Sequence, residues 1–297
     1  MKNAPALFLM LWIAAASASV TAVDSDGRRV TLARPAQRIV SLAPHVTELL
    51  FAAGAGGKIV AASEYSDFPE EAKRLPHVAG SAGVDIEGVL ALRPDLAVAW
   101  RLDATAKTLD RLEALGVPIF YSEPHRLEDI PAAIEALGTL AGTEERARAE
   151  AERLRAELQR LRASHRDRRP IDVFYQISER PLMTLNGQHF VSDALAICGG
   201  RNVFADAPII APAISIEAVI AADPAVIVAA RLDPADTSWQ AAWRRFPQLR
   251  AVRNSNLLAL RSEEMHRHGP RAIGATSRLC DLLDQARTRN INAASQR

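Results

Sequence analysis

The densest group of side chains that could do chemistry is residues 262–271, which read SEEMHRHGPR. The guanidinium of Arg267 could bind a carbonyl, phosphate or carboxylate group. His266 and His268 are two residues apart, which would place them on different faces of a helix and does not match the H-E-x-x-H spacing of zinc enzymes. Two interpretations stay open, a binding loop or a solvated loop ahead of a helix. A metal-ion site at this place would draw on His45, Tyr65, His266 and His268.

Two aromatic residues stand where strands are expected to end. Trp100 follows an apolar run, and Tyr65 lies in a polar loop between Ser-Glu and Ser-Asp. Aromatic residues are only 5% of the chain, and their flat faces suit a large planar ligand. The alternative for both is ordinary packing, for Trp100 against a neighbouring helix.

Signatures of common enzymes are absent from the sequence. There is no G-x-S-x-G nucleophile elbow and no phosphate-binding G-x-x-x-x-G-K-[ST] loop. No G-x-G-x-x-G opens a helix, because Gly54, Gly56 and Gly57 follow one instead. We therefore predict no catalytic residue, no resident cofactor and no metal centre, and an exported metal-dependent hydrolase is a distant alternative.

Strands alternate with helices along most of the chain, which predicts parallel pairing and an α/β fold. An entry hairpin is expected at 23–35. The expected strands are 38–42, 59–62, 94–100, 117–121, 171–177, 182–185, 224–230 and 256–260. The expected helices are 45–53 capped by Thr47, 85–92 capped by Asp85, 104–115, 127–140, 191–198, 215–222, 238–246 and 270–287, with a frayed tail after the last.

A long charged helix is predicted at 142–169. Its apolar residues recur at helical spacing, with Thr143 as a candidate cap and Pro170 as the stop. Because the other faces are almost wholly charged, the apolar stripe is narrow and the helix should lie on a surface. The apolar stripe consists of Ala147, Ala151, Leu154, Leu158 and Leu161.

An internal repeat flanks this helix. Residues 86–99 read IEGVLALRPDLAVA and residues 216–229 read IEAVIAADPAVIVA. Each copy follows a capping residue, Asp85 or Ser215. Two copies are too few for a solenoid, and they fit two lobes of one topology with the long helix as a strut between them.

Glu87 and Glu217 occupy the same place in the two copies. One interpretation is local, because an acid in the first turn of a helix interacts favourably with the helix dipole. The other is functional, with two exposed carboxylates that meet basic residues on a partner of two-fold symmetry.

Composition and the N-terminus narrow the class further. Charges nearly cancel, with 36 Lys and Arg against 35 Asp and Glu, so no global charge favours nucleic acid. Lys2, an apolar run at 6–16 and Ala-x-Ala-type sites after Ala18 or Ala22 predict a cleaved signal peptide at 1–22 and an exported protein. In an oxidising compartment Cys198 and Cys280 would form one disulfide, with two buried thiols as the alternative.

Together these segments resemble one known family. The chain resembles the periplasmic substrate-binding proteins of ABC importers that have a single backbone helix, a group that carries cobalamin, haem and iron-siderophore complexes. The likeness covers nearly the whole chain after the signal. The segments that carry it are RIVSLAP at 38–44 with Thr47-Glu48, YSDFP at 65–69, PDLAVAWR at 94–101, CGGRNVF at 198–204 and GPR at 269–271 leading to Leu279-Cys280.

The resemblance implies a role for particular residues. Glu87 and Glu217 would dock the lobes onto arginines of a two-fold symmetric permease that works with ATPase subunits. Cys198 and Cys280 match the family's disulfide. Ser81 and Ala211 stand where cobalamin-binding members have tryptophans, which thins the aromatic lining. The residues implied to contact the ligand are Tyr65, Trp100, Glu263, Glu264, Met265, His266 and Arg267.

We therefore expect two Rossmann-like lobes with parallel-rich sheets, at 23–141 and 170–297, with a ligand cleft between them. The resemblance implies a monomeric periplasmic protein that captures cobalamin or a related corrinoid and delivers it to an ABC importer. Haem or a ferric siderophore is the alternative ligand, since His266 and His268 could suit a metal complex. A single continuous helix between the lobes predicts little lobe movement on binding.

Overall fold

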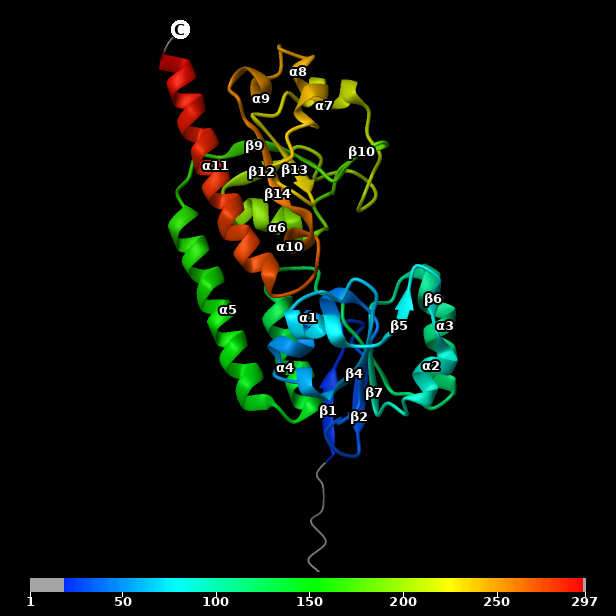
Figure 1. Ribbon diagram of the computed structural model, residues 1–297. Coiled ribbons are helices and arrows are strands. Elements are labelled where there is room, and N and C mark those ends of the chain that lie inside the picture. The colour runs from blue at the N-terminus through cyan, green and yellow to red at the C-terminus, as the bar shows by residue number, and fades with distance from the viewer. Residues whose placement is uncertain (1–18, 296–297) are drawn as a thin grey trace, which may run out of the picture.

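The computed structural model describes residues 19–295 and shows two α/β lobes connected along one side by long helices (Figure 1). Most of the predicted signal peptide, residues 1–18, lies outside the described residues. The entry hairpin starts earlier than predicted, with β1 (Val20–Val23) antiparallel to β2 (Arg29–Leu32). Gly27 in its turn has a φ of 76°, which glycine adopts without steric cost.

The N-terminal lobe contains a six-stranded sheet in the order β6-β5-β4-β3-β7-β8. All neighbours are parallel except the edge strand β6, which pairs antiparallel with β5. The central strands read IVS and LAVA and are fully buried, as expected where helices cover both faces. The strands are β3 (Ile39–Ser41), β4 (Ile59–Ser63), β5 (His77–Gly80), β6 (Gly83–Val84), β7 (Leu96–Ala99) and β8 (Ile119–Tyr121). The helices are α1 (Pro44–Ala52), α2 (Ile86–Ala91), α3 (Asp103–Ala114) and α4 (Asp129–Ala141).

The C-terminal lobe contains a four-stranded parallel sheet in the order β12-β9-β13-β14. A small hairpin, β10 (Ser178–Glu179) and β11 (Leu182–Met183), follows β9. The sheet strands are β9 (Ile171–Gln176), β12 (Gly200–Asn202), β13 (Val226–Arg231) and β14 (Leu257–Arg261). The helices are α6 (Phe190–Ile197), α7 (Ile216–Ala222), α8 (Gln240–Arg244), α9 (Arg250–Arg253), α10 (Ser262–Met265) and α11 (Arg271–Ser295).

The two lobes share one topology, as the sequence repeat predicts. The spatial order β4-β3-β7-β8 matches β12-β9-β13-β14, and the two copies of the repeat form α2–β7 and α7–β13. Both predicted caps are present, because the Asp85 carboxylate accepts from the Gly88 N–H at 2.9 Å and the Ser215 hydroxyl accepts from the Ala218 N–H at 3.1 Å. The two lobes therefore share equivalent helix caps as well as the same strand order.

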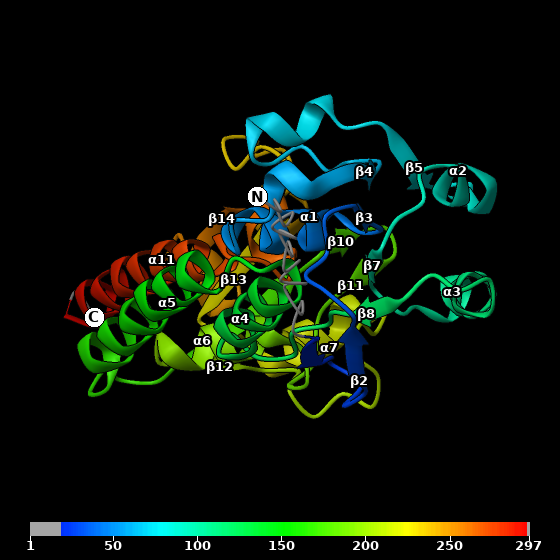
Figure 2. The same cartoon turned by 90° about the horizontal axis from the view of Figure 1, so that it is seen from below.

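The strut helix is α5 (Glu144–His165). Its buried residues are Ala147, Ala151, Leu154 and Leu158, which confirms most of the predicted stripe. Its first half packs on α4, where a Cβ at Gly138 would lie 2.2 Å from the Ala147 Cβ. Its second half lies beside α11, while α2 and α3 stand on the opposite side of the molecule (Figure 2). Thr143 occupies the N-cap position of this helix, as predicted, but its hydroxyl makes no capping hydrogen bond and instead donates to the Ala53 carbonyl at 2.7 Å.

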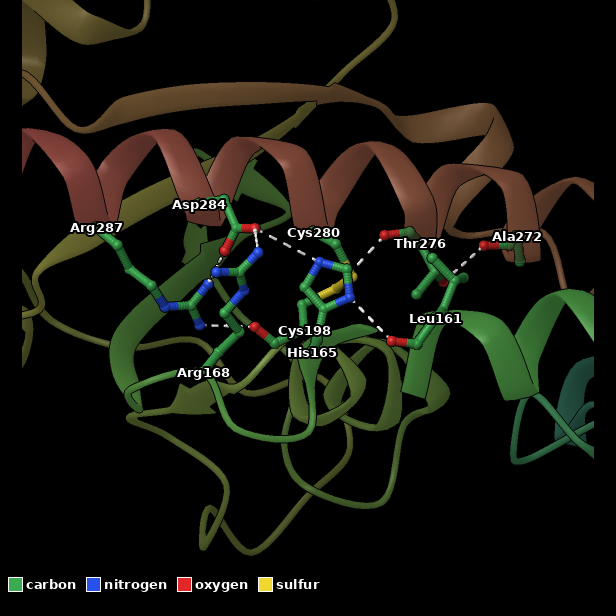
Figure 3. Close-up of a disulfide and its surroundings, with 9 residues drawn as sticks. All are labelled: Leu161, His165, Arg168, Cys198, Ala272, Thr276, Cys280, Asp284 and Arg287. Atoms are coloured by element: carbon green, nitrogen blue, oxygen red, sulfur yellow. Dashed lines mark hydrogen bonds and ion pairs between the residues drawn. A yellow bond between two sulfur atoms is a disulfide. The ribbon is translucent and has the colours of Figure 1, made fainter. Parts of the chain in front are cut away.

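The disulfide Cys198–Cys280 joins the end of α6 to α11, with the two Cα atoms 4.7 Å apart (Figure 3). This confirms the predicted pair and its location within one lobe. One helical turn further along α11, Asp284 lies 3.0 Å from the Arg168 guanidinium and 2.6 Å from that of Arg287. The pair with Arg168 ties the segment that follows α5 to α11, whereas the pair with Arg287 lies within α11.

The last helix extends further than the sequence predicts. α11 continues to Ser295 instead of fraying after residue 287. The side-chain oxygen Oδ1 of Asn290 accepts hydrogen bonds from the side-chain amides of Asn254 and Asn256, a tertiary contact that holds this part of the helix. Among the helices of the described residues, none combines the length and apolar character needed to cross a membrane.

Candidate ligand-binding site

The residues singled out by the sequence follow the carboxyl ends of parallel strands. Tyr65 comes after β4, Trp100 directly after β7, and residues 262–271 after β14. In open α/β sheets, ligands bind in the crevice outside these strand ends. The structure brings Trp100 into contact with His268 of the 262–271 segment, and the loop that carries Tyr65 reaches the same segment through Asp67 and Arg267.

An aromatic cluster links the two lobes at this place. The Trp100 ring centroid lies 5.4 Å from that of His45 on α1 and 5.4 Å from that of His268. His268 in turn packs edge-on against Phe190 at 4.9 Å and against His189 at 5.4 Å. His45 and Trp100 belong to the N-terminal lobe and the other three to the C-terminal lobe, so the rings form part of the lobe–lobe contact.

The imidazoles of this region are held neutral. Burial lowers the pKa of His45 to about 4 and the pKa of His189 to about 4. Burial, together with the neighbouring histidines, lowers the pKa of His268 to about 3, and burial alone lowers the pKa of His266 to about 4. Because charging a desolvated imidazole is unfavourable, these side chains act here as packing rings rather than as cations.

Trp100 leaves one polar group without a partner. Its indole N–H is buried, and no hydrogen-bond acceptor in residues 19–295 pairs with it. A buried N–H without an acceptor costs about 1–3 kcal/mol. The core residue Trp239 has an unpaired indole N–H as well, so what distinguishes Trp100 is its partly exposed position at the end of β7.

Tyr65 is presented to solvent by a constrained loop. Its side chain is 72% exposed, and its backbone adopts the left-handed conformation with φ 62°. A non-glycine residue pays about 1–2 kcal/mol for this conformation. The next residue, Ser66, is buried, and its hydroxyl accepts from the Thr47 hydroxyl at 2.9 Å. The predicted capping role of Thr47 is therefore wrong, because its hydroxyl is used in this tertiary contact inside α1.

Arg267 is surrounded by carboxylates of the protein. Its Nη1 lies 2.5 Å from Asp67 Oδ1 and 3.3 Å from Glu48 Oε1, and its Nη2 lies 3.9 Å from Glu263 Oε1. Arg271 donates two further hydrogen bonds to Glu48 at 2.6 and 3.0 Å. Although partial burial alone would raise it, the pKa of the Asp67 carboxyl is lowered by the hydrogen bond and charge of Arg267.

The remaining predicted contacts of this segment differ in exposure. Glu263 is partly exposed. His266 is hydrogen-bonded through Nε2 to the Tyr175 hydroxyl at 3.1 Å. Met265 is completely buried in the core, and Glu264 pairs with Arg278 on α11. A ligand cannot reach a side chain without exposed surface, so we do not carry Met265 into the proposed ligand set. Glu264 is partly exposed, and we leave it out because its carboxylate is engaged by Arg278.

Glu87 and Glu217 take no part in this cluster and occupy matching positions on the two lobes. Both are exposed, in the first turn of α2 and of α7. Neither forms an ion pair with another described residue. The fold thus leaves two equivalent carboxylates, one on each lobe, available to an external partner.

The sequence did not identify several residues of the site. His189 and Phe190 carry no spacing signal in the sequence, because a single histidine or phenylalanine is not informative by itself. Glu48 stands in a segment that carries the family resemblance, but nothing local indicates its ion pairs with Arg267 and Arg271. Within the part of the chain that is described, no group of three His, Cys, Asp or Glu residues could hold a metal ion.

Comparison with known proteins gives consistent matches. The family profile described as "Periplasmic binding protein" matches residues 39–264. The vitamin B12-binding protein of Vibrio parahaemolyticus is 37% identical over 253 residues, which are 85% of this chain and 91% of the relative. That of Yersinia pestis is 39% identical over 251 residues, which are 84% of this chain and 88% of the relative.

Among solved structures, a vitamin B12-binding protein is again more similar to this chain than a haem-binding protein is. The crystal structure of the periplasmic vitamin B12 binding protein of Vibrio cholerae matches with a TM-score of 0.79 and 39% identity, over 85% of this chain and 98% of the other. A periplasmic haem-binding protein of Roseiflexus matches with a TM-score of 0.73 and 26% identity, over 84% of this chain and 98% of the other.

Proposed function

This chain belongs to the periplasmic binding protein family, and we propose from that premise that it captures cobalamin or a related corrinoid in the periplasm and delivers it to an ABC importer. The observation that carries the proposal is the difference in similarity. Relatives named for vitamin B12 binding are 37–39% identical, whereas the haem-binding protein of Roseiflexus is 26% identical. The activity is binding for transport, not catalysis.

We propose export through a signal peptide cleaved after Ala18. Cleavage after Ala22, the other predicted site, would remove three of the four residues of β1. Those residues pair with β2 from Val20 opposite Leu32 to Ala22 opposite Val30, and the Ala22 side chain is buried in the core. Cleavage after Ala18 leaves the hairpin whole, which supports that site.

We propose that the ligand binds between the N-terminal lobe, residues 23–141, and the C-terminal lobe, residues 170–297. The proposed contacts are Tyr65, Trp100 and the partly exposed Glu263. The exposed Tyr65 and the partly exposed Trp100 offer flat aromatic surface together with a phenolic hydroxyl for polar contact, which suits a macrocycle with polar side chains. The ring of His266 is committed to Tyr175 and that of His268 is 8% exposed. Neither imidazole is therefore free to ligate haem iron at this loop.

For delivery we propose that Glu87 and Glu217 dock a single copy of the protein onto the two membrane subunits of the importer. The two carboxylates are exposed and stand in equivalent positions on lobes of the same topology. A pseudo-two-fold arrangement of acids fits a permease dimer that presents one basic site per subunit. A monomer suffices for this geometry, because one chain supplies both carboxylates.

The ligand assignment is tested by equilibrium titration of the purified protein. We expect cyanocobalamin to bind with one site per chain and a visible spectral shift, and haemin and a ferric siderophore to give no saturable signal. Saturable binding of haemin without binding of cyanocobalamin would overturn the assignment in favour of haem. Turnover of an ester or phosphate substrate without binding of any of the three would overturn the transport function itself.

A further inference from the structure

The loop that carries Tyr65 is fixed on one side by its own lobe. Ser66, next to Tyr65, is 3% exposed, and its hydroxyl lies 2.9 Å from that of Thr47 and 3.1 Å from that of Ser63. Thr47 also lies 2.7 Å from the Ser41 hydroxyl. These contacts fix the position of Ser66 within the N-terminal lobe, but they leave the following part of the loop without an anchor there.

The other side of the loop is fixed by the C-terminal lobe. Asp67, two residues after Tyr65, pairs with Arg267 at 2.5 Å. The guanidinium of Arg271 stacks on the ring of Phe68, with its central carbon 4.4 Å from the ring centroid. Arg271 is the first residue of α11 and Arg267 lies just before it, at the end of the helix that approaches α1 in Figure 1. The loop is therefore clamped between elements of different lobes.

A buried carboxylate completes the clamp. The side chain of Glu48 on α1 is 1% exposed and accepts hydrogen bonds from both Arg267 and Arg271. Two carboxylates thus neutralise two guanidinium groups, so Arg267 has no uncompensated charge to offer a ligand. Removing one member would leave a partner buried and unpaired, which makes the set interdependent.

We propose that Arg267 is a positioning residue, which holds the Tyr65 loop from the opposite lobe through Asp67, and that it does not contact the ligand. The same interaction couples the ligand platform of one lobe to the placement of the other lobe. This proposal deepens the function proposed above and rests on it, because it treats Tyr65 as a ligand contact.

The test combines single replacements with a charge exchange. The variants are Asp67→Asn, Arg267→Gln and the double variant Asp67→Arg/Arg267→Asp. Arg278→Gln is the matched control, because Arg278 is a cation of α11 whose partner Glu264 lies in the same lobe. Each variant is titrated with cyanocobalamin, and hydrogen exchange of the amides at 64–68 is measured without ligand.

We expect Asp67→Asn and Arg267→Gln to raise the Kd by about five- to tenfold each, which lies within the range of coupling between residues in one network. Amide exchange at 64–68 should accelerate in both, the charge exchange should recover part of the affinity, and Arg278→Gln should match the wild type. A loss of affinity in Arg267→Gln with none in Asp67→Asn, and no recovery on exchange, would make Arg267 a direct contact and overturn the proposal.

Different results would contradict the proposed function and the proposed positioning role of Arg267. If wild-type protein does not bind cyanocobalamin, the proposed function fails, while hydrogen exchange at 64–68 still reports on the clamp. If wild-type protein binds but exchange at 64–68 is the same in all variants, the clamp fails and the proposed function stands. Thermal melts of each variant show whether the change is confined to the loop.

Discussion

The two copies of the internal repeat have the same fold and differ where their strands end. α2–β7 and α7–β13 carry equivalent caps, Asp85 and Ser215, and equivalent exposed acids in the first helical turn. At the end of the strand, Trp100 in one copy corresponds to Ala230 in the other, and the following Arg-Leu pair is again shared. The repeat is therefore symmetric at its helix starts and asymmetric at the ligand edge.

This difference separates two kinds of partner. A permease built from two equivalent subunits presents the same surface twice, so residues that dock onto it are expected to be alike in both lobes. A corrinoid has no such symmetry, so the residues that contact it need not be alike. We infer that Glu87 and Glu217 belong to the first kind and Trp100 and Tyr65 to the second.

The largest effect is expected at the symmetric acids. If the proposed docking holds, replacing both Glu87 and Glu217 by Arg would place like charges opposite basic sites of the permease, which costs several kcal/mol and should reduce uptake to background. Uptake of labelled cyanocobalamin into vesicles that contain the importer measures this. The two single variants should be impaired to a similar extent, and ligand titration should be unchanged in all three. Loss of ligand binding in the double variant would contradict the separation of roles.

Replacing Trp100, which has no aromatic counterpart in the other copy, should weaken ligand binding. Trp100→Ala should raise the Kd for cyanocobalamin by about 10- to 100-fold, as for other buried aromatic contacts, because it removes a large surface and an indole N–H. Calorimetric titration measures the effect. Leu115→Ala, at an exposed apolar residue after α3, serves as the control. An unchanged Kd in Trp100→Ala would place the ligand elsewhere.

Acid should weaken the ligand edge and the lobe–lobe contact together. His45, His189, His266 and His268 have pKa values of about 3–4 in the folded protein against an ordinary value of 6.5. A folded pKa below the unfolded one means full stability above about pH 6.5, with a loss of about 1.4 kcal/mol per pH unit for each group as the pH falls towards 4.

Urea unfolding between about pH 7 and pH 5 measures this dependence as a decrease of several kcal/mol in the free energy of unfolding. His189→Phe, which removes one titrating group from the cluster, should make the dependence shallower. His77→Gln, at an exposed histidine on β5, should leave it unchanged. A free energy of unfolding that is constant over this range would show that these imidazoles are not held neutral by burial.

The smallest effect is expected at the helix caps, where the two copies should again behave alike. Asp85→Ala and Ser215→Ala each remove one hydrogen bond to a first-turn N–H and should each cost about 1 kcal/mol. Thermal unfolding of the two variants measures this cost. A large effect in one copy and none in the other would show that the local equivalence of the lobes does not extend to their energetics.

Much of the architecture could be predicted from local patterns. Apolar strands, caps such as Asp85 and Ser215, and the apolar stripe of α5 depend on residues close in sequence, so the sequence displays them directly. A threonine near a helix start favours a cap locally, but tertiary contacts determine how its hydroxyl is used: Thr47 lies inside α1 and contacts Ser66, and Thr143 stands at the N-cap position of α5 while its hydroxyl bonds to Ala53.

The site could be predicted only in part, for the same physical reason. Trp100 and Tyr65 stand out because they follow strand ends. The clamp of Glu48, Asp67, Arg267 and Arg271 joins residues about two hundred positions apart, and no local spacing reveals such a contact. The extension of α11 to Ser295 likewise depends on side-chain contacts of Asn290 with another segment.

The most direct test of the account is a crystal structure of the protein with bound cyanocobalamin. We predict that the corrinoid lies between the lobes against Tyr65 and Trp100, with Glu87 and Glu217 free of ligand and with only a small change in lobe orientation across α5. A corrinoid bound away from Tyr65 and Trp100, or a large closure of the lobes around a bent α5, would contradict it.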